Sequence, residues 1–220
     1  MAASEANEPQ TAMGDSREYF ARVADQWDEI RAGYFTEVMR DAAIAKAALP
    51  PGAVAADIGT GTGFVAAALA RQARHVYAFD ASPEMLAAAS RNLSGLSNVT
   101  LKQAEGQTIP LPDESVDGVF ANMYLHHAPD PAAAIREMVR LLKPGGVLCI
   151  TDLDSHEYAW FREQMADVWL GFRREDVGEW YARAGLAEVD IECAAGTCDS
   201  VSPAGERIHA SVFVAVGRKP

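Results

Sequence analysis

Short apolar runs alternate with amphipathic stretches through the middle of the chain. The apolar runs have the length of strands and lie near residues 54–58, 75–80, 99–104, 116–123 and 147–153. Between them, helical spacing of apolar positions predicts helices near 63–72, 83–93 and 131–142. This alternation indicates an α/β fold with a parallel sheet, helices on both faces and right-handed crossovers.

Two helices are expected ahead of this region. Apolar residues at helical spacing follow Arg17, and a second helix is expected from about Phe35 to Leu49, where Pro50-Pro51 stops it. Residues 1–15 are small and polar, and we expect a flexible leader there.

The end of the chain predicts one more helix, at 176–184, and two more strands. The strands are expected at 187–194 and 211–217, with a long connection between them. Together these elements predict a single domain over 16–220.

The 220 residues carry a net charge of −12, which disfavours nucleic acid as a partner. No apolar run of about 18 residues is present, so no membrane span is expected. Residues 1–15 also lack the basic and apolar regions of a signal peptide. Three cysteines do not suggest a disulfide framework, and a reduced, cytoplasmic protein is the simplest expectation.

A glycine-rich turn at Ala56–Gly63 follows the first apolar run and precedes a helical one. Its glycines let a ligand approach bare backbone, and the helix start offers free N–H groups. Asp57 stands before the first glycine, where a carboxylate favours a ligand that carries a cationic group. Asp80 ends the next apolar run, at the distance where an acid accepts hydrogen bonds from ribose hydroxyls.

At these residues the chain resembles the class I S-adenosylmethionine-dependent methyltransferases, in particular the small-molecule branch that includes ubiquinone- and menaquinone-biosynthesis enzymes. The resemblance covers about residues 17–217, and four motifs carry it: Ala56-Asp-Ile-Gly-Thr-Gly-Thr-Gly63, Tyr77-Ala-Phe-Asp-Ala-Ser-Pro-Glu-Met85, Leu111-Pro-Asp-Glu-Ser-Val-Asp117 and Leu141-Leu-Lys-Pro-Gly-Gly146. It implies a Rossmann-like, doubly wound, seven-stranded sheet, mostly parallel with an antiparallel last strand. It also implies S-adenosylmethionine as cofactor, S-adenosylhomocysteine as product, and direct transfer of the methyl group to a small-molecule acceptor.

The resemblance further implies which residues hold the cofactor. The glycine turn would hold its amino acid portion, the end of the second strand its ribose, and the end of the third strand its adenine. Residues 16–50 would form lid helices over it. The candidate cofactor residues are Asp57, Gly59, Thr60, Gly61, Gly63, Asp80, Ala81, Met85, Ala104, Glu105, Asn122, Tyr19 and Trp27. For Tyr19 and Trp27 the alternative is the packed face of an amphipathic helix, and for Met85 it is a core methionine.

Candidates for the reaction itself follow the fourth strand, in the segment that lines the methyl-transfer centre of the family. They are Tyr124, His126 and His127, of which the histidines are suited to general base catalysis near neutral pH. The alternative for His126 is a structural histidine that shapes the loop. Direct displacement requires no metal, and none is expected.

Asp152, Asp154 and His156 follow the fifth strand within five positions. They suit either a patch that binds the acceptor or a metal, or a turn that caps a helix. Cys149 is expected in the core.

Cys193 and Cys198 suggest a different function, a metalloid (arsenite-like) or thiol methyltransferase, against the simpler interpretation of two ordinary thiols. A nicotinamide-dependent oxidoreductase and a non-enzymatic cofactor-binding module are two further hypotheses. The sequence leaves the acceptor undefined, and leaves open whether the protein is a monomer or a homodimer.

Overall fold

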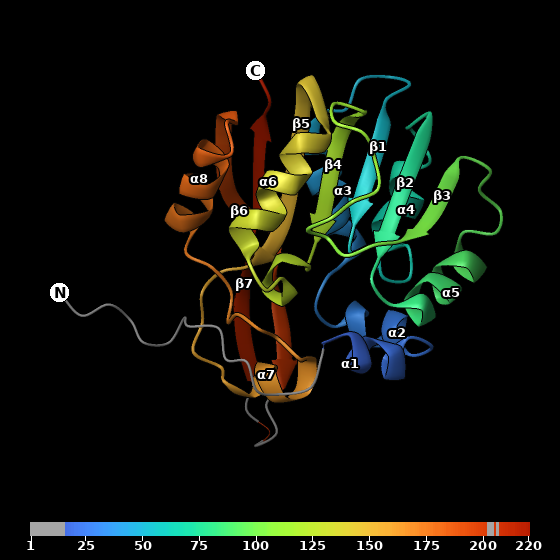
Figure 1. The fold of residues 1–220 in the computed structure, drawn as a ribbon. Helices are drawn as coiled ribbons and strands as arrows, with labels where there is room; N and C mark the ends of the chain where they lie inside the picture. The colour runs from blue at the N-terminus through green and yellow to red at the C-terminus, as the bar shows by residue number, and fades with distance from the viewer. Residues whose placement is uncertain (1–15, 202–204, 206) are drawn as a thin grey trace.

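A seven-stranded sheet forms the centre of the protein, with strand order β3-β2-β1-β4-β5-β7-β6 and helices on both faces (Figure 1). The computed structural model describes residues 16–201, 205 and 207–220, so the predicted leader lies outside the described residues. The first five strands are parallel, and β7 is antiparallel to both of its neighbours. The predicted fold is therefore confirmed. The strands are β1 Val54–Ile58, β2 His75–Asp80, β3 Val99–Gln103, β4 Val116–Asn122, β5 Leu142–Leu153, β6 Ala187–Val201 and β7 Arg207–Arg218.

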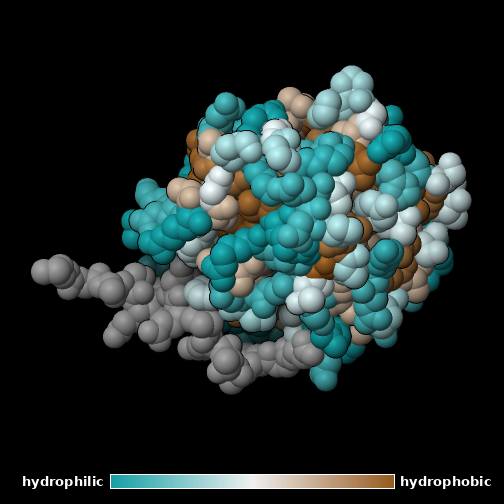
Figure 2. All heavy atoms as spheres, turned by 45° about the horizontal axis from the view of Figure 1, so that its top comes forward, coloured by the Kyte–Doolittle hydropathy of each residue, from teal (hydrophilic) through white to brown (hydrophobic). Residues whose placement is uncertain are grey.

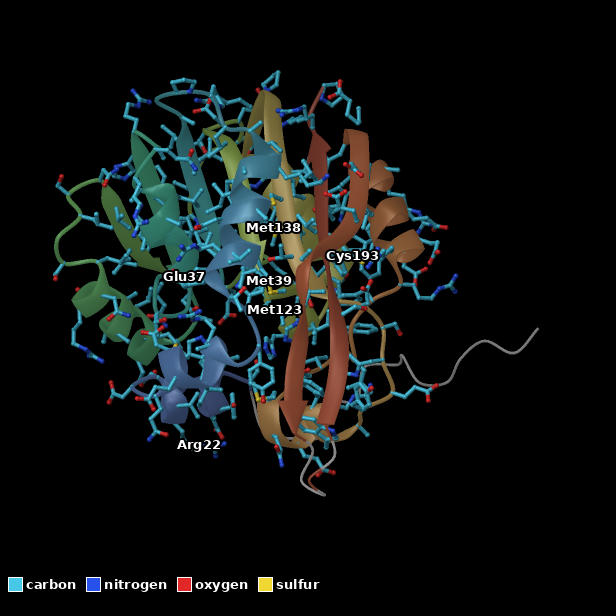
Figure 3. The ribbon with its side chains drawn as sticks, turned by 180° about the vertical axis from the view of Figure 1, so that it is seen from behind. Arg22, Glu37, Met39, Met123, Met138 and Cys193 are labelled. Atoms are coloured by element: carbon cyan, nitrogen blue, oxygen red, sulfur yellow. The ribbon has the colours of Figure 1, made fainter. Side chains whose placement is uncertain are left out.

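Two layers of helices bury the two faces of the sheet. One face packs against α3 (Glu37–Ala47), α4 (Phe64–Leu69) and α5 (Pro83–Asn92), and the other against α6 (Pro131–Leu141) and α8 (Arg174–Arg183). Figure 3 shows α3 in front of the sheet, where Met39 is almost fully buried. Burial of side chains of this size is worth about 1.5–3 kcal/mol each, so these two layers supply most of the stabilisation.

Local sequence signals set several helix starts, as predicted. Ser82 Oγ accepts a hydrogen bond from the Met85 N–H at 3.2 Å, with Pro83 at the first helical position. Asp130 Oδ1 accepts one from Ala133 N–H at 2.9 Å, again directly before a proline. These short-range contacts explain why α5 and α6 begin where the sequence indicates.

Three boundaries differ from the prediction. The expected first helix is divided into α1 (Ser16–Val23) and α2 (Trp27–Ala32), because the chain turns between them. β5 begins at Leu142 rather than at 147, because Leu142 already pairs with Val116 of β4. The long loop expected at 195–210 is wrong, since β6 and β7 continue through most of it as a hairpin. Pairing with a partner strand outweighs the weak strand propensity of the small residues there.

The surface carries the negative charge without a large apolar patch on the visible side. Hydrophilic side chains spread across the face in Figure 2, and hydrophobic ones lie between them in small groups. Val38 and Val189 are the exposed large hydrophobic residues of the described part of the chain. No helix among the described residues is long and apolar enough to cross a membrane.

Candidate functional site

A cavity of about 320 Å³ lies at the carboxyl ends of β1, β2, β4 and β5, beneath α1, α2 and α7 (Trp160–Met165). Figure 1 shows these three helices at the lower end of the sheet, beyond the carboxyl ends of its parallel strands. This is the rim where parallel α/β sheets bind their ligands. Most of the predicted site residues line it: Trp27, Asp57, Gly59, Thr60, Gly61, Asp80, Ala81, Met85, Ala104, Glu105, Asn122, Tyr124, His126 and His127.

Two glycines of the turn after β1 have a positive φ, and side chains from other segments lie close to their Cα atoms. Gly59 has φ +70°, and a Cβ there would lie 2.5 Å from Cδ2 of Tyr124. Gly61 has φ +53°, and a Cβ there would lie 3.5 Å from Nε1 of Trp27. Larger residues would be strained at both positions and would crowd the cavity. Trp27 therefore covers the turn, in the place expected of a lid residue.

Asp57 is 1% exposed and lies at the base of the turn. Its Oδ2 accepts hydrogen bonds from Thr60 Oγ1 at 2.6 Å and from Ala66 N at 3.0 Å. Burial raises the pKa of Asp57 to about 7, against these two hydrogen bonds, which lower it. A cationic ligand group nearby would restore the ionised form.

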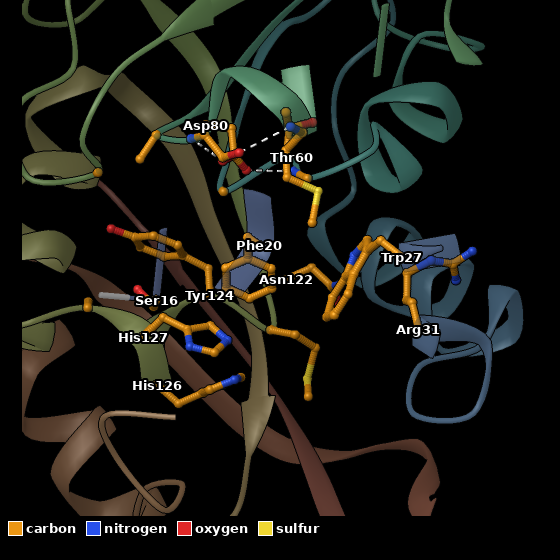
Figure 4. A pocket seen from close by; sticks show the side chains of 18 of the residues that line it. Ser16, Phe20, Trp27, Arg31, Thr60, Asp80, Asn122, Tyr124, His126 and His127 are labelled. Atoms are coloured by element: carbon orange, nitrogen blue, oxygen red, sulfur yellow. Dashed lines mark hydrogen bonds between the residues drawn. The ribbon is translucent and has the colours of Figure 1, made fainter. Parts of the chain in front are cut away.

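Asp80 accepts backbone hydrogen bonds on both carboxylate oxygens: Oδ2 from Gly61 N at 2.8 Å and Oδ1 from Ser82 N at 2.9 Å (Figure 4). Burial raises the pKa of Asp80. A carboxylate has about four lone-pair sites, so Asp80 keeps acceptor capacity on the side that lines the cavity.

Three further candidates complete this end of the cavity. Met85 is 2% exposed and contributes an apolar surface. Glu105 forms an ion pair with Arg17, which links α1 to the segment after β3. Asn122 is fixed by Thr151, whose hydroxyl donates to Asn122 Oδ1 at 2.7 Å.

The histidines lie at the opposite end of the cavity from Asp80, with Phe20 and Tyr124 between (Figure 4). Nδ1 of His126 lies 2.7 Å from Oδ1 of Asp152, a buried carboxylate that also accepts the backbone N–H of Leu125 at 2.8 Å. Burial lowers the pKa of His126, but the carboxylates of Asp152 and Asp167 outweigh it and raise the pKa to about 9.

His127 is held differently from its neighbour. Its Nδ1 lies 3.2 Å from the carbonyl oxygen of Ala166, and its ring contacts that of Phe20 edge-on, with centroids 4.9 Å apart. Burial, and then the neighbouring His126, lower the pKa of His127 well below its usual value. His127 is therefore neutral near pH 7, whereas His126 is cationic.

Asp152, Asp154 and His156, at the carboxyl end of β5, do not form one patch and do not cap a helix. Asp152 lies beneath His126, whereas Asp154 accepts two 2.7 Å hydrogen bonds from the guanidinium of Arg174. His156 packs against Phe161, and burial lowers its pKa to about 4. Each side chain has its own tertiary partner, which the sequence pattern alone did not reveal.

Two of the candidates, Tyr19 and Gly63, do not line the cavity, and the sequence analysis missed several residues that do, of which two charged ones bear on its chemistry. The hydroxyl of Tyr19 lies 3.5 Å from Met165 Sδ, and a Cβ on Gly63 would meet Leu93. These two charged residues are Arg31 and Asp167. Arg31 stands four positions after Trp27, so helical spacing was a usable signal. Asp167 had no local signal, because its neighbours come from distant segments.

The cysteines lie away from the cavity where they are described. Cys149 is buried as predicted, and burial raises the pKa of its thiol to about 12. Cys193 stands on β6 and is exposed, with Arg174 Nη2 at 3.1 Å from its sulfur (Figure 3). The backbone of Cys198 pairs with Ala210, and its side chain lies outside the described part. Neither Cys149 nor Cys193 is among the residues that line the cavity.

Several known proteins with a similar sequence are methyltransferases. The family model described as "Methyltransferase domain" matches residues 56–150. A 2-methyl-6-phytyl-1,4-hydroquinone methyltransferase of Oryza sativa subsp. japonica is 32% identical over 74% of this chain and 50% of its own length. A demethylmenaquinone methyltransferase of Clavibacter sepedonicus is 35% identical over 45% of this chain and 40% of its own. The chain thus spans about half the length, or less, of these curated relatives.

The fold is also found among solved structures. A phosphoethanolamine N-methyltransferase of Haemonchus contortus, solved with S-adenosylhomocysteine, superposes with a TM-score of 0.74 at 18% identity, covering 94% of this chain and 59% of the other. Three observations point to a methyltransferase: the order of the strands, the glycine turn with Asp57 and Asp80, and the names of the sequence relatives. Residues 56–150 therefore carry a methyltransferase domain, and the chain has the fold of the class I S-adenosylmethionine-dependent methyltransferases.

Proposed function

We propose that this protein transfers a methyl group from S-adenosylmethionine to a small hydroxylated aromatic acceptor, in a direct displacement. One observation carries the proposal: a continuous cavity has the glycine turn and Asp80 at one end and a histidine pair at the other. One relative named as a hydroquinone methyltransferase and another named as a demethylmenaquinone methyltransferase support an aromatic acceptor of the quinone type.

The residues at the first end fit the cofactor. Gly59 and Gly61 leave a cradle that a side chain would fill, and Asp80 keeps acceptor capacity for ribose hydroxyls. Arg31 lines the same cavity, with its Nε 3.7 Å from Oδ1 of Asp28 and its Nη1 donating to the carbonyl oxygen of Phe35. Its positive charge suits the carboxylate of the amino acid portion. Asp57 would face the ammonium group. The bound cofactor supplies a methyl group on a positively charged sulfur.

The acceptor end suits a flat ring. Phe20, Tyr124 and Phe161 offer aromatic surface, and the two histidines offer polar atoms to a hydroxyl group. In a direct displacement the protein aligns the acceptor behind the methyl group and excludes water. We assign the exclusion of water to the lid, residues 16–50, because α1 and α2 cover the cavity. We assign the positioning of the acceptor to Tyr124, His126 and His127.

The test is a transfer assay with methyl-labelled S-adenosylmethionine and a panel of reduced quinones, phenols, amines, thiols and arsenite. We expect labelled product from a hydroquinone or phenol and none with the Asp80→Ala variant. Tight S-adenosylhomocysteine binding without any transfer would favour the non-enzymatic module. Binding of NADH without S-adenosylhomocysteine would favour the oxidoreductase.

The free thiols of Cys149 and Cys193 fit a reducing compartment, so we propose a cytoplasmic location. We also retain the prediction of a monomer or homodimer without a nucleic acid partner.

A further inference from the structure

Three side chains with metal-binding atoms meet at the acceptor end of the cavity: His126, His127 and Asp167. One nitrogen or oxygen from each lies within 4.8 Å of the others. Nε2 of His126 and Oδ1 of Asp167 are 3.6 Å apart. In a tetrahedral site with bonds of about 2.0–2.2 Å, ligand atoms lie roughly 3.3–3.6 Å apart. His126 and Asp167 already have this spacing, and metal binding would draw the wider contacts of the cluster together by no more than about 1.5 Å.

Both histidines are already oriented through one ring nitrogen. Asp152 holds the Nδ1 of His126, and the carbonyl of Ala166 holds the Nδ1 of His127. In this arrangement each Nδ1 proton points to an oxygen acceptor, and a metal bound at Nε2 would displace the second proton that His126 carries when it is cationic. A carboxylate or carbonyl behind each imidazole is the usual outer support of metal-binding histidines, because it sets the tautomer and raises the basicity of the ligand nitrogen.

Asp167 provides an independent observation. Asp167 is 5% exposed and lines the cavity, yet neither of its carboxylate oxygens has a hydrogen-bond partner within the described residues. A buried carboxylate without hydrogen bonds is costly, and most buried polar groups are satisfied. The ring of His126 is the charged group that faces it most closely, and 3.6 Å is too long for a good hydrogen bond. A divalent cation between the three groups would give the carboxylate of Asp167 the partner that it lacks.

We propose that His126, His127 and Asp167 bind a divalent transition metal of the zinc type. Two imidazoles and one carboxylate are a donor set that suits such borderline ions, and three protein ligands leave a coordination position open. Because all three residues line the cavity, that position would be open to it. It would take the hydroxyl oxygen of the acceptor; this role rests on the proposed function, whereas the metal site itself does not.

The test uses Co²⁺ and Zn²⁺ on the untagged, chelator-treated protein. A Cys193→Ser/Cys198→Ser background prevents binding by the thiols. Visible absorption of bound Co²⁺ reports the coordination directly, and displacement by Zn²⁺ from a chromogenic chelator gives the affinity. We expect about one equivalent, with affinity lowered more than 100-fold by Asp167→Asn or His127→Gln. Asp152→Asn, which removes only the support behind His126, should lower it by about 10–100-fold.

The matched control is His75→Gln, because His75 lies on β2 and contacts Thr100 rather than the cavity. It should bind Co²⁺ as the background protein does, and thermal unfolding without metal checks that each variant is folded. Absence of binding, or equal binding by the folded Asp167→Asn variant, would overturn the proposal. Titration with S-adenosylhomocysteine is run separately, so that failure of the metal site is distinguished from failure of the proposed function.

Discussion

The sharpest test of the cofactor site is removal of the Asp80 carboxylate. Both of its oxygens already accept backbone N–H groups, from Gly61 at 2.8 Å and Ser82 at 2.9 Å. The proposal adds two ribose hydroxyls to the same carboxylate. The Asp80→Ala variant removes all four hydrogen bonds, whereas Asp80→Asn keeps the size of the side chain and one acceptor oxygen but loses the charge.

Hydrogen bonds to a charged group contribute about 1.5–3 kcal/mol each. Two ribose bonds are then worth about 3–6 kcal/mol, and part of this is offset when water replaces the lost carboxylate. We expect Asp80→Ala to raise the Kd of S-adenosylhomocysteine by about 10²–10³-fold, since 1.4 kcal/mol is tenfold. Asp80→Asn should fall between this variant and the wild type. Both should lower the free energy of unfolding by about 1–3 kcal/mol, because the turn loses bonds from Gly61 and Ser82.

Isothermal titration calorimetry measures the Kd, and thermal unfolding shows whether each variant is folded. The matched control is Asp113→Asn, an exposed acid that pairs with Arg140 and does not line the cavity. Its affinity should equal that of the wild type. A folded Asp80→Ala variant that binds S-adenosylhomocysteine as tightly as the wild type would refute the ribose assignment.

Three further predictions follow from buried or paired groups. Burial raises the pKa of Asp57 from 3.8 to about 7, so the unfolded chain ionises first, and this group should lower the free energy of unfolding between about pH 4 and 7 by at most about 4 kcal/mol. Denaturant titrations of Asp57→Asn should show a smaller fall over this range than the wild type, because burial also raises the pKa of Asp167 to about 7 and that contribution remains. Asp154→Asn should weaken the pair with Arg174 and lower the free energy of unfolding by about 1–3 kcal/mol. Calorimetry should find an unchanged Kd for S-adenosylhomocysteine, and a higher Kd would place Asp154 in the site. The Cys193→Ser/Cys198→Ser variant should retain methyl transfer to hydroquinones in the labelled assay, and arsenite methylation by the wild type that this variant loses would restore the metalloid alternative.

Contacts between near neighbours were predictable from the sequence. The apolar run, glycine turn and helix at Ala56–Gly63 depend on the backbone freedom of glycine and on residues only a few positions apart. Ser82 and Asp130 cap their helices within three residues, and each precedes a proline suited to the first helical turn. Parallel pairing then follows from strand–helix alternation, which is why Asp57 and Asp80 were expected on one rim.

Contacts between distant segments were decided only by the tertiary structure. The loop expected between β6 and β7 is mostly strand, because each segment supplies backbone partners that the other lacks. His126 and Asp152 are 26 positions apart and meet because β4 and β5 are adjacent and parallel. Asp167 reaches the same place from a segment without periodicity.

The sequence by itself therefore determined the parallel sheet and the glycine turn with Asp57 and Asp80 on one rim, because glycine conformation, helix capping and apolar periodicity act over a few residues. The tertiary structure alone decided which carboxylates surround the histidines and which of them stay unpaired. Burial and electrostatic pairing depend on distance in space, and segments far apart along the chain supply these groups.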